Sequence, residues 1–237
     1  MSKLLNLATP IPVAENVEKL MDIVTDTFSS QFRFIQNNGE DLMDFITSTL
    51  TSIPPYVFIL IVAVLAFFAT GKKFGLAIFS ILGLLFILNQ GLWDQLMNTF
   101  TLVMFSSLIA IIIGIPLGIL MSKSKVVEEI LKPILDFMQT MPGFVYLIPA
   151  VAFFGIGVVP GVFASVIFAL PPTVRFTNLG IRQVPKHLIE AADSYGSTFT
   201  QKLLKVELPL SKATIMAGIN QTVLLSLSMV VIASMIG

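Results

Sequence analysis

The residues best suited to act together lie in the segment 175–212, between two long apolar stretches. Its pattern is Glu190-Ala191-Ala192, then Gly196, then Val206 and Leu208-Pro209. These residues do not include a nucleophile paired with a base. The alanines are small and have charged neighbours, so a partner protein can approach them closely. A short helix of this kind can dock into a groove on another protein. The segment therefore indicates protein–protein contact and not bond-breaking chemistry.

The spacing within this segment predicts two short helices that meet at a glycine. Pro185 suits the first turn of the first helix, and Gly196 suits its end. Thr198 and Gln201 have the spacing of a capping box, which would start the second helix, and Pro209 is expected to break it. Leu188, Ala191, Ala192 and Tyr195 should form one face of the first helix. The two alanines are expected to lie on an exposed edge of that face.

Other chemistry has few residues to work with. The chain has one histidine, His187, and no cysteine, so only scattered carboxylates could hold a metal. The sequence contains neither a glycine-rich phosphate loop ending in Lys-Ser or Lys-Thr nor a GxSxG elbow. We therefore expect no catalytic residue, no metal site and no cofactor in this chain.

The elements that carry the segment are predicted to cross a membrane. The 237 residues are 55% hydrophobic and only 12% charged, and the mean hydropathy is +0.91. A soluble domain has about 25% charged residues. Basic and acidic residues number 14 each, so the net charge gives no reason to expect a nucleic-acid partner. The composition indicates an all-α, polytopic membrane helix bundle.

Five long runs contain no charged residue and no histidine, and each can hold a span. A helix needs about 20 apolar residues to cross the hydrocarbon layer. The longest run, 137–174, is divided by turn formers at Gly155, Gly157, Pro160 and Gly161, so it should hold two helices. The sequence therefore predicts six spans, at roughly 54–71, 74–90, 98–122, 134–155, 160–174 and 212–236.

Residues 1–53 are predicted to form an amphipathic region before the transmembrane part, 54–237. Apolar residues recur at three- and four-residue steps from Val17 onward. Asn38-Gly39 should end this helix, and a second short piece should precede Pro54-Pro55. Two interpretations stay open for the region: it lies in the membrane interface, or it packs against the bundle.

The basic residues indicate an orientation. If the first span runs inward, 11 of the 14 lie on one side, and the positive-inside rule makes that side cytoplasmic. The N-terminal region would then be extracytoplasmic. The inner set is Lys72, Lys73, Lys123, Lys125, Lys132, Arg175, Arg182, Lys186, Lys202, Lys205 and Lys212, and the outer set is Lys3, Lys19 and Arg33.

The pattern in 175–212 resembles the EAA motif of ABC importer permeases, with Val206 where isoleucine is common. The stretch 136–185 is similar to the permeases of osmoprotectant importers, the glycine betaine and proline class, and the resemblance runs from about residue 92 to 237. The N-terminal region is similar to members from Gram-positive bacteria, in which permease and receptor can be one polypeptide. Such members continue past this point, so the chain is expected to be truncated after Ile236-Gly237.

The resemblance implies a fold of the type I ABC importer permease kind in the bacterial plasma membrane, and ATP-driven uptake of a compatible solute, most simply glycine betaine. It also implies two partner ATPase subunits that bind ATP and Mg, a second permease copy, and an extracytoplasmic receptor, fused or separate. The residues that would transmit force from the ATPases, acting through the cytoplasmic coupling loop 175–212, are Glu190, Ala191, Ala192, Gly196, Leu208 and Pro209.

A path for glycine betaine should be uncharged and aromatic, because cation–π contacts of about 0.5–2 kcal/mol guide a quaternary ammonium without trapping it. The candidates beside the expected kink at Pro142-Gly143 are Met138, Gln139, Met141, Phe144 and Tyr146. Asn220 and Gln221 would either hydrogen-bond between helices or face the same path. Asp136, at the edge of a span, is expected to pair with Lys132.

Two alternatives remain from the sequence. The permease could carry another cargo, such as proline or methionine, because the receptor selects the substrate. The chain could also be a non-transporting membrane scaffold that uses the same loop to recruit a cytoplasmic partner.

Overall fold

A computed structural model describes residues 13–235. Ile236-Gly237 and Lys3 lie outside the described residues. The described chain holds helices and no strand, which confirms the all-α expectation. Its elements are α1 (Val13–Thr27), α2 (Ser29–Thr51), α3 (Pro55–Ala69), α4 (Phe74–Asn89), α5 (Trp93–Lys123), α6 (Lys125–Thr140), the 3-10 turn η2 (Gly143–Tyr146), α7 (Leu147–Phe154), α8 (Val158–Arg182), α9 (Lys186–Ser194), α10 (Phe199–Lys202), the π-helical turn η3 (Leu203–Glu207) and α11 (Leu208–Ala233).

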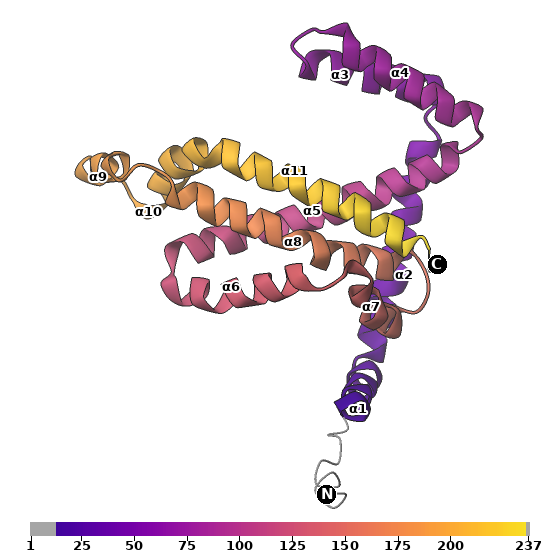
Figure 1. Ribbon diagram of the computed structural model, residues 1–237, viewed down its shortest axis with the longest axis horizontal. Coiled ribbons are helices and arrows are strands. Elements are labelled where there is room, and N and C mark those ends of the chain that lie inside the picture. The colour runs from indigo at the N-terminus through magenta and orange to yellow at the C-terminus, as the bar shows by residue number, and fades with distance from the viewer. Residues whose placement is uncertain (1–12, 236–237) are drawn as a thin grey trace, which may run out of the picture.

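The core is formed by α5, α8 and α11, which lie side by side (Figure 1). Small residues let the backbones of these helices approach one another. This is expected in a membrane, because burying apolar surface gives no hydrophobic stabilisation in lipid and helix association depends on close packing. Gly114 meets Thr173, and one turn later Gly118 meets Thr177, so α5 and α8 run parallel. A Cβ built on Gly218 of α11 would lie 2.6 Å from the Cβ of Phe176. The three helices are therefore packed too closely for larger side chains at these glycines.

Thr222→Val should destabilise this core more than Thr173→Val. The Thr222 hydroxyl lies 2.7 Å from the Thr173 hydroxyl and donates to the Ala169 carbonyl at 3.0 Å. Without the Thr222 hydroxyl, the buried Thr173 hydroxyl loses its hydrogen-bond partner. When Thr173 is changed instead, the Thr222 hydroxyl keeps its hydrogen bond to the Ala169 carbonyl. Since inter-helix bonds contribute about 0.6–1.7 kcal/mol, we expect a loss of about 1–2 kcal/mol for Thr222→Val. Thermal unfolding in detergent measures both variants, and equal losses would contradict this assignment.

Within residues 13–235, three helices are long and apolar enough to cross a membrane: Trp93–Lys123, Val158–Arg182 and the continuous helix Phe199–Ala233. They coincide with the third, fifth and sixth expected spans, which are thereby confirmed as long apolar helices. The expected spans 54–71 and 74–90 coincide with α3 and α4, which have 15 and 16 residues. α3 reaches the length of a span only together with α2, from which it is bent by 89°.

The expectation of one helix over 134–155 is wrong. The segment consists of α6, η2 and α7, and the chain turns by 111° between α6 and the pair η2–α7. Pro142 explains the break, because it pushes the preceding residue out of the helical region, and Met141 has ψ 136°. The predicted kink at Pro142-Gly143 is confirmed, but it is a reversal of direction. The predicted glycine break also occurs: Gly155 and Gly157, at φ +77° and +154°, separate α7 from α8.

The N-terminal helices differ from the expectation in where they break. Asn38-Gly39 does not end a helix; the break comes at Phe28, and α2 continues through to Thr51. Gly39 lies against Val159 of α8, where a Cβ would come within 3.0 Å, so the glycine permits close packing instead of a turn. Phe32 stacks on Phe153 of α7 with ring centroids 5.0 Å apart. Hence α2 packs against the bundle, while α1 extends beyond it (Figure 1).

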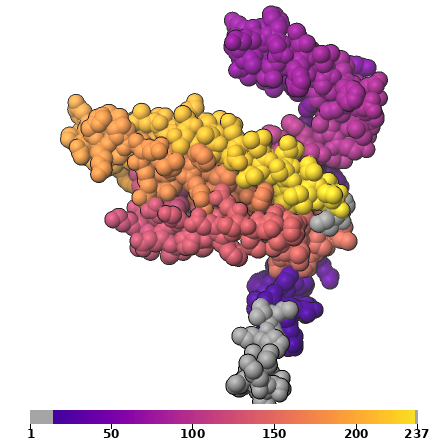
Figure 2. Space-filling model, viewed as in Figure 1, coloured from indigo at the N-terminus to yellow at the C-terminus, as the bar shows by residue number. Residues whose placement is uncertain are grey.

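The α3–α4 hairpin stands apart from the three core helices (Figure 2). It is anchored where α3 and the start of α5 meet, through the T-shaped contact of Phe58 with Trp93 at 5.7 Å. Its surface is apolar, with Phe68, Phe74 and Phe79 between 64% and 73% exposed. Such a surface suits contact with lipid or with another hydrophobic chain.

Candidate functional site

The segment with the distinctive motif forms two short helices at one end of the bundle (Figure 1). α9 follows Pro185, and α10 follows the turn at Gly196 and continues through η3 into α11. We call residues 185–208 the coupling unit. Residues 175–182 and 208–212, which were expected in the loop 175–212, are helical parts of α8 and α11.

The sequence signals for the turn between the two helices are confirmed. Gly196 has φ +72° and donates its N–H to the Asp193 carbonyl at 2.9 Å, while the Ser197 N–H reaches the Ala192 carbonyl at 3.1 Å. These two bonds are the pair that defines a Schellman motif. Thr198 and Gln201 then form a reciprocal capping box at the start of α10. The angle between the helices is therefore fixed by local hydrogen bonds.

The predicted docking residues divide into exposed and buried ones. Glu190, Ala191 and Gly196 are exposed, and Tyr195 beside them is 89% exposed. The expectation of an exposed shoulder is wrong for Ala192, which is only 9% exposed because α9 packs against η3. The free face of the unit is therefore made by the residues around Glu190 and Tyr195.

Pro209 does not break the second helix, contrary to the expectation. Helix α11 begins at Leu208, so Pro209 stands in its first turn, where a missing N–H costs little. The preceding turn η3 is π-helical, and the Leu208 N–H bonds to the Leu203 carbonyl, five residues back. This wider turn makes room for a proline ring that would otherwise press on the preceding turn. The coupling unit consequently continues without a break into a spanning helix.

Ion pairs fasten the coupling unit and its neighbours to the bundle. Glu207, 2% exposed, pairs with Lys123 at the end of α5. Arg182, at the end of α8, pairs with Glu128 at 2.6 Å and donates to the Met121 carbonyl at 3.0 Å. The end of α5, the start of α6, the end of α8 and η3 therefore meet at the end of the core that carries the coupling unit. We call these two ion pairs the charged layer.

Sequence reasoning missed this layer, because residues 123 and 207 are 84 positions apart and no local pattern joins them. It also gave Asp136 the wrong partner: the carboxylate pairs with Arg175 of α8 and not with Lys132. Within the coupling unit, Lys202 pairs with Asp193 at 2.6 Å and ties α10 to α9.

The candidate path residues beside the chain reversal lie close together. Met138 and Gln139 end α6, Met141 follows, and Phe144 and Tyr146 belong to η2. The Tyr146 hydroxyl donates to the Met138 carbonyl at 2.6 Å and thereby ties the two sides of the reversal. Phe144 is 56% exposed and Gln139 is exposed, so these two are available to a solute or to a second subunit.

Asn220 and Gln221 are remote from that cluster in the sequence and lie in the middle of α11. Asn220 and Gln221 are both exposed, and within the described residues neither side chain bonds to another helix. The inter-helix role is therefore not seen within this chain.

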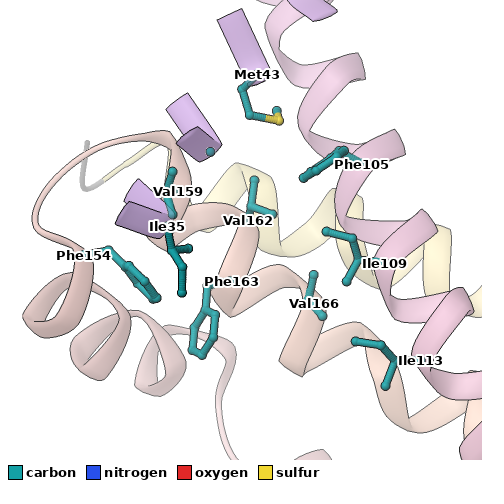
Figure 3. Close-up of a pocket in the computed structure, with 11 residues that line it drawn as sticks. Ile35, Met43, Phe105, Ile109, Ile113, Phe154, Val159, Val162, Phe163 and Val166 are labelled. Carbon is teal, nitrogen blue, oxygen red and sulfur yellow. The ribbon is translucent and has the colours of Figure 1, made fainter. Parts of the chain in front are cut away.

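An apolar cavity of about 270 Å³ lies between α2, α5, α7 and α8 (Figure 3). Figure 3 shows Ile35 and Met43 of α2 facing Ile109 and Phe105 of α5 across it. Its wall offers almost no polar surface, so it cannot hydrate a charged solute. None of the seven candidate path residues lines it.

A second cavity, of about 520 Å³, has polar and apolar residues in its wall and lies where α2 meets the start of α5 and the end of α11. Its polar residues are Asp44, Thr47, Gln95, Asn98, Thr99 and Ser234. This cavity is at the end of α5 opposite Lys123, hence far from the coupling unit. Among the described residues, no group of three or more potential metal ligands comes together.

Comparison with known proteins relates this geometry to a family. The family model described as "Binding-protein-dependent transport system inner membrane component" matches residues 110–237, which include the whole coupling unit. The chain is 58% identical over 229 residues to the glycine betaine/carnitine transport permease protein of Listeria monocytogenes serotype 1/2a (strain 10403S), covering 96% of this chain and 81% of that protein.

Two further relatives agree. The glycine betaine transport system permease protein of Bacillus subtilis (strain 168) is 49% identical over 227 residues, 96% of this chain and 80% of that protein. The glycine betaine/proline betaine transport system permease protein of Escherichia coli (strain K12) is 45% identical over 228 residues, 96% of this chain and 64% of that protein. The chain therefore belongs to the inner-membrane components of binding-protein-dependent transport systems, as an ABC importer permease of the osmoprotectant class.

Proposed function

We propose that this chain is the membrane subunit of an ATP-driven importer whose cargo is glycine betaine. The names of its relatives support the cargo, because three of them transport glycine betaine. The observation that carries the mechanism is the coupling unit, a pair of helices joined by a hydrogen-bonded turn, with an exposed face and continuous with the long apolar helix Phe199–Ala233. A non-transporting scaffold is not supported, since the family is one of transport components.

The partners follow from the same proposal. Two ATPase subunits would bind ATP and Mg and dock on the coupling unit, and a second copy of this chain would complete the translocation path. A receptor outside the membrane, fused or separate, would deliver the solute, in keeping with the binding-protein dependence of the family. This chain holds no catalytic residue in the proposal, and hydrolysis takes place in the partner.

In the proposed cycle, ATP closes the two ATPases, which move the coupling units and tilt the spanning helices between outward- and inward-facing states. Glu190 and Ala191 contact the ATPase on the exposed face. Ala192 and Gly196 keep α9 and α10 at a fixed angle, and Leu208-Pro209 pass the movement to α11. None of these residues contacts the solute.

We propose that the path is lined by Met138, Gln139, Met141, Phe144 and Tyr146, together with Asn220 and Gln221. Their side chains are uncharged, and aromatic faces can attract a trimethylammonium group without a strong trap. Cysteines at Gln139 and Asn220 should react with a water-soluble maleimide in the assembled transporter. Protection of both positions in all states would refute this lining.

The coupling unit is proposed to lie in the cytoplasm and the N-terminus outside. Basic residues of the charged layer and of the coupling unit lie together at one end of the bundle. By the positive-inside rule, this supports a cytoplasmic location for that end. Since the chain has no cysteine, single-cysteine variants give an unambiguous test. On intact cells, Leu92→Cys should react with an impermeant maleimide, whereas Tyr195→Cys should react only after permeabilisation. The reverse pattern would invert the topology.

Uptake by the reconstituted complex tests the function. The permease, its ATPase and its receptor, placed in proteoliposomes with internal ATP, should accumulate radiolabelled glycine betaine. Unlabelled carnitine, proline and methionine are added in turn as competitors to define the cargo. Failure to accumulate glycine betaine, with strong uptake of one competitor, would reassign the cargo, and no uptake of any of them would refute the proposal.

A further inference from the structure

Glu207 is a buried acid at the junction between the coupling unit and α11. It is 2% exposed and closes the π-helical turn directly before α11 begins. Its partner in the described structure is Lys123, the last residue of α5. An unpaired carboxylate in such a position is unfavourable, because removing its charge from water is costly.

Lys123 holds the second helix of the coupling unit at both of its ends. Its ammonium pairs with Glu207 and also lies 5.5 Å from the ring centre of Phe199, the first residue of α10. One side chain on α5 therefore contacts both the first and the last residue of the segment from Phe199 to Glu207. The unit is also joined to the core by the chain itself, through residues 183–185 to α8 and through Leu208 to α11.

Stability alone does not explain this pair. Buried ion pairs are often no more stabilising than packed apolar side chains of similar size. Their advantage is a fixed distance and direction, because the charges must stay together while the surroundings move. A pair between the coupling unit and α5 is placed to transmit displacement to a third core helix, which does not adjoin the unit along the chain.

We propose that the Lys123–Glu207 pair is the contact through which movement of the coupling unit reaches α5, which makes both side chains positioning residues for transport. The proposal rests on the proposed function. α5 packs along α8 through Gly114 and Gly118, so a pull at Lys123 would move the two parallel helices together. Without the pair, α5 is moved only indirectly, through its packing against α8 and α11.

The test measures the number of glycine betaine molecules taken up per ATP hydrolysed by the complete transporter in proteoliposomes. Glu207→Gln should lower this ratio at least about fivefold while ATP hydrolysis continues. The charge exchange Lys123→Glu with Glu207→Lys should restore part of the ratio. Asp136→Asn is the matched control, since it breaks the Arg175–Asp136 pair, whose side chains are 35% and 54% exposed. It should leave the ratio within twofold.

A second variant, which leaves no unpaired buried charge, separates loss of coupling from loss of folding. Lys123→Met with Glu207→Met removes both charges but keeps the volume, so the protein should fold, and the ratio should still fall. An unchanged ratio in this variant and in Glu207→Gln would overturn the proposal, as would a lower melting temperature with normal coupling. If the unmodified transporter takes up no glycine betaine, the proposed function itself is wrong, which is a distinct result.

Discussion

Gly118→Val is expected to prevent recovery of a folded protein. A Cβ at Gly118 would lie 2.5 Å from the Cβ of Thr177 and 2.7 Å from the backbone oxygen of Val174. A backbone atom cannot turn aside as a flexible side chain can, so α5 and α8 would have to separate. Overpacking costs about 1–3 kcal/mol, and this contact belongs at the upper end. Even Gly118→Ala should therefore lower the melting temperature in detergent by about 6–12 °C.

Gly83→Ala on α4 is the matched control. No atom outside its own helix lies within 4 Å of a Cβ built at Gly83. Alanine favours the helix by about 1 kcal/mol over glycine, so this change should be neutral or slightly stabilising. Equal melting temperatures for Gly118→Ala and Gly83→Ala would show that the α5–α8 contact is looser than described.

Gly196→Pro is expected to abolish coupled transport and leave the spanning helices inserted. Proline requires a φ near −65°, whereas Gly196 has φ +72°, and its N–H bonds to the Asp193 carbonyl. The Schellman turn would be lost, and α9 would leave its fixed angle to α10. We expect glycine betaine uptake to fall more than about tenfold, since misplacing a positioned element by about 1 Å can cost a hundredfold in rate. Uptake and ATP hydrolysis are measured on the same proteoliposomes.

Gly71→Pro provides a control with the same local defect in another place. Gly71, between α3 and α4, has φ +66°, and its N–H bonds to the Phe68 carbonyl. It lies outside the coupling unit, so its loss should reduce uptake far less than the loss of Gly196. A bulky residue at Ala192, which is buried against η3, should act like Gly196→Pro. Normal uptake by either coupling-unit variant would contradict the lever role of these two helices.

Local signals in the sequence predicted local structure well. Gly196 ends α9, Thr198 and Gln201 form their capping box, and Gly155 and Gly157 divide the long apolar run. In each case the residue type and its immediate neighbours determine the backbone. The three long spanning helices were also predictable, because a continuous apolar run of that length has few alternatives in a membrane.

The errors arose where distant contacts decide the outcome. Asn38-Gly39 resembles a helix end, but Gly39 instead fits against Val159 of α8. Pro209 resembles a helix breaker, but the π-helical turn before it accommodates its ring. The partner of Glu207 could not be predicted, since Lys123 becomes its neighbour only after α5 and α11 have packed together. The residues of the coupling unit were thus predicted from the motif, whereas their contacts with the bundle could be found only in the structure.

The central claim is that the coupling unit docks on an ATPase, and cross-linking from Tyr195 tests it most directly. Tyr195 is 89% exposed at the turn of the unit, and Tyr195→Cys would introduce the only cysteine in the chain. In the assembled transporter, a short bifunctional reagent should join this position to the ATPase, with a yield that changes when ATP is added. A single cysteine placed instead at Tyr56, 71% exposed at the start of α3, should give no such product. If the Tyr195→Cys thiol reacts freely with a water-soluble maleimide in every nucleotide state and forms no cross-link to the ATPase, the account is contradicted.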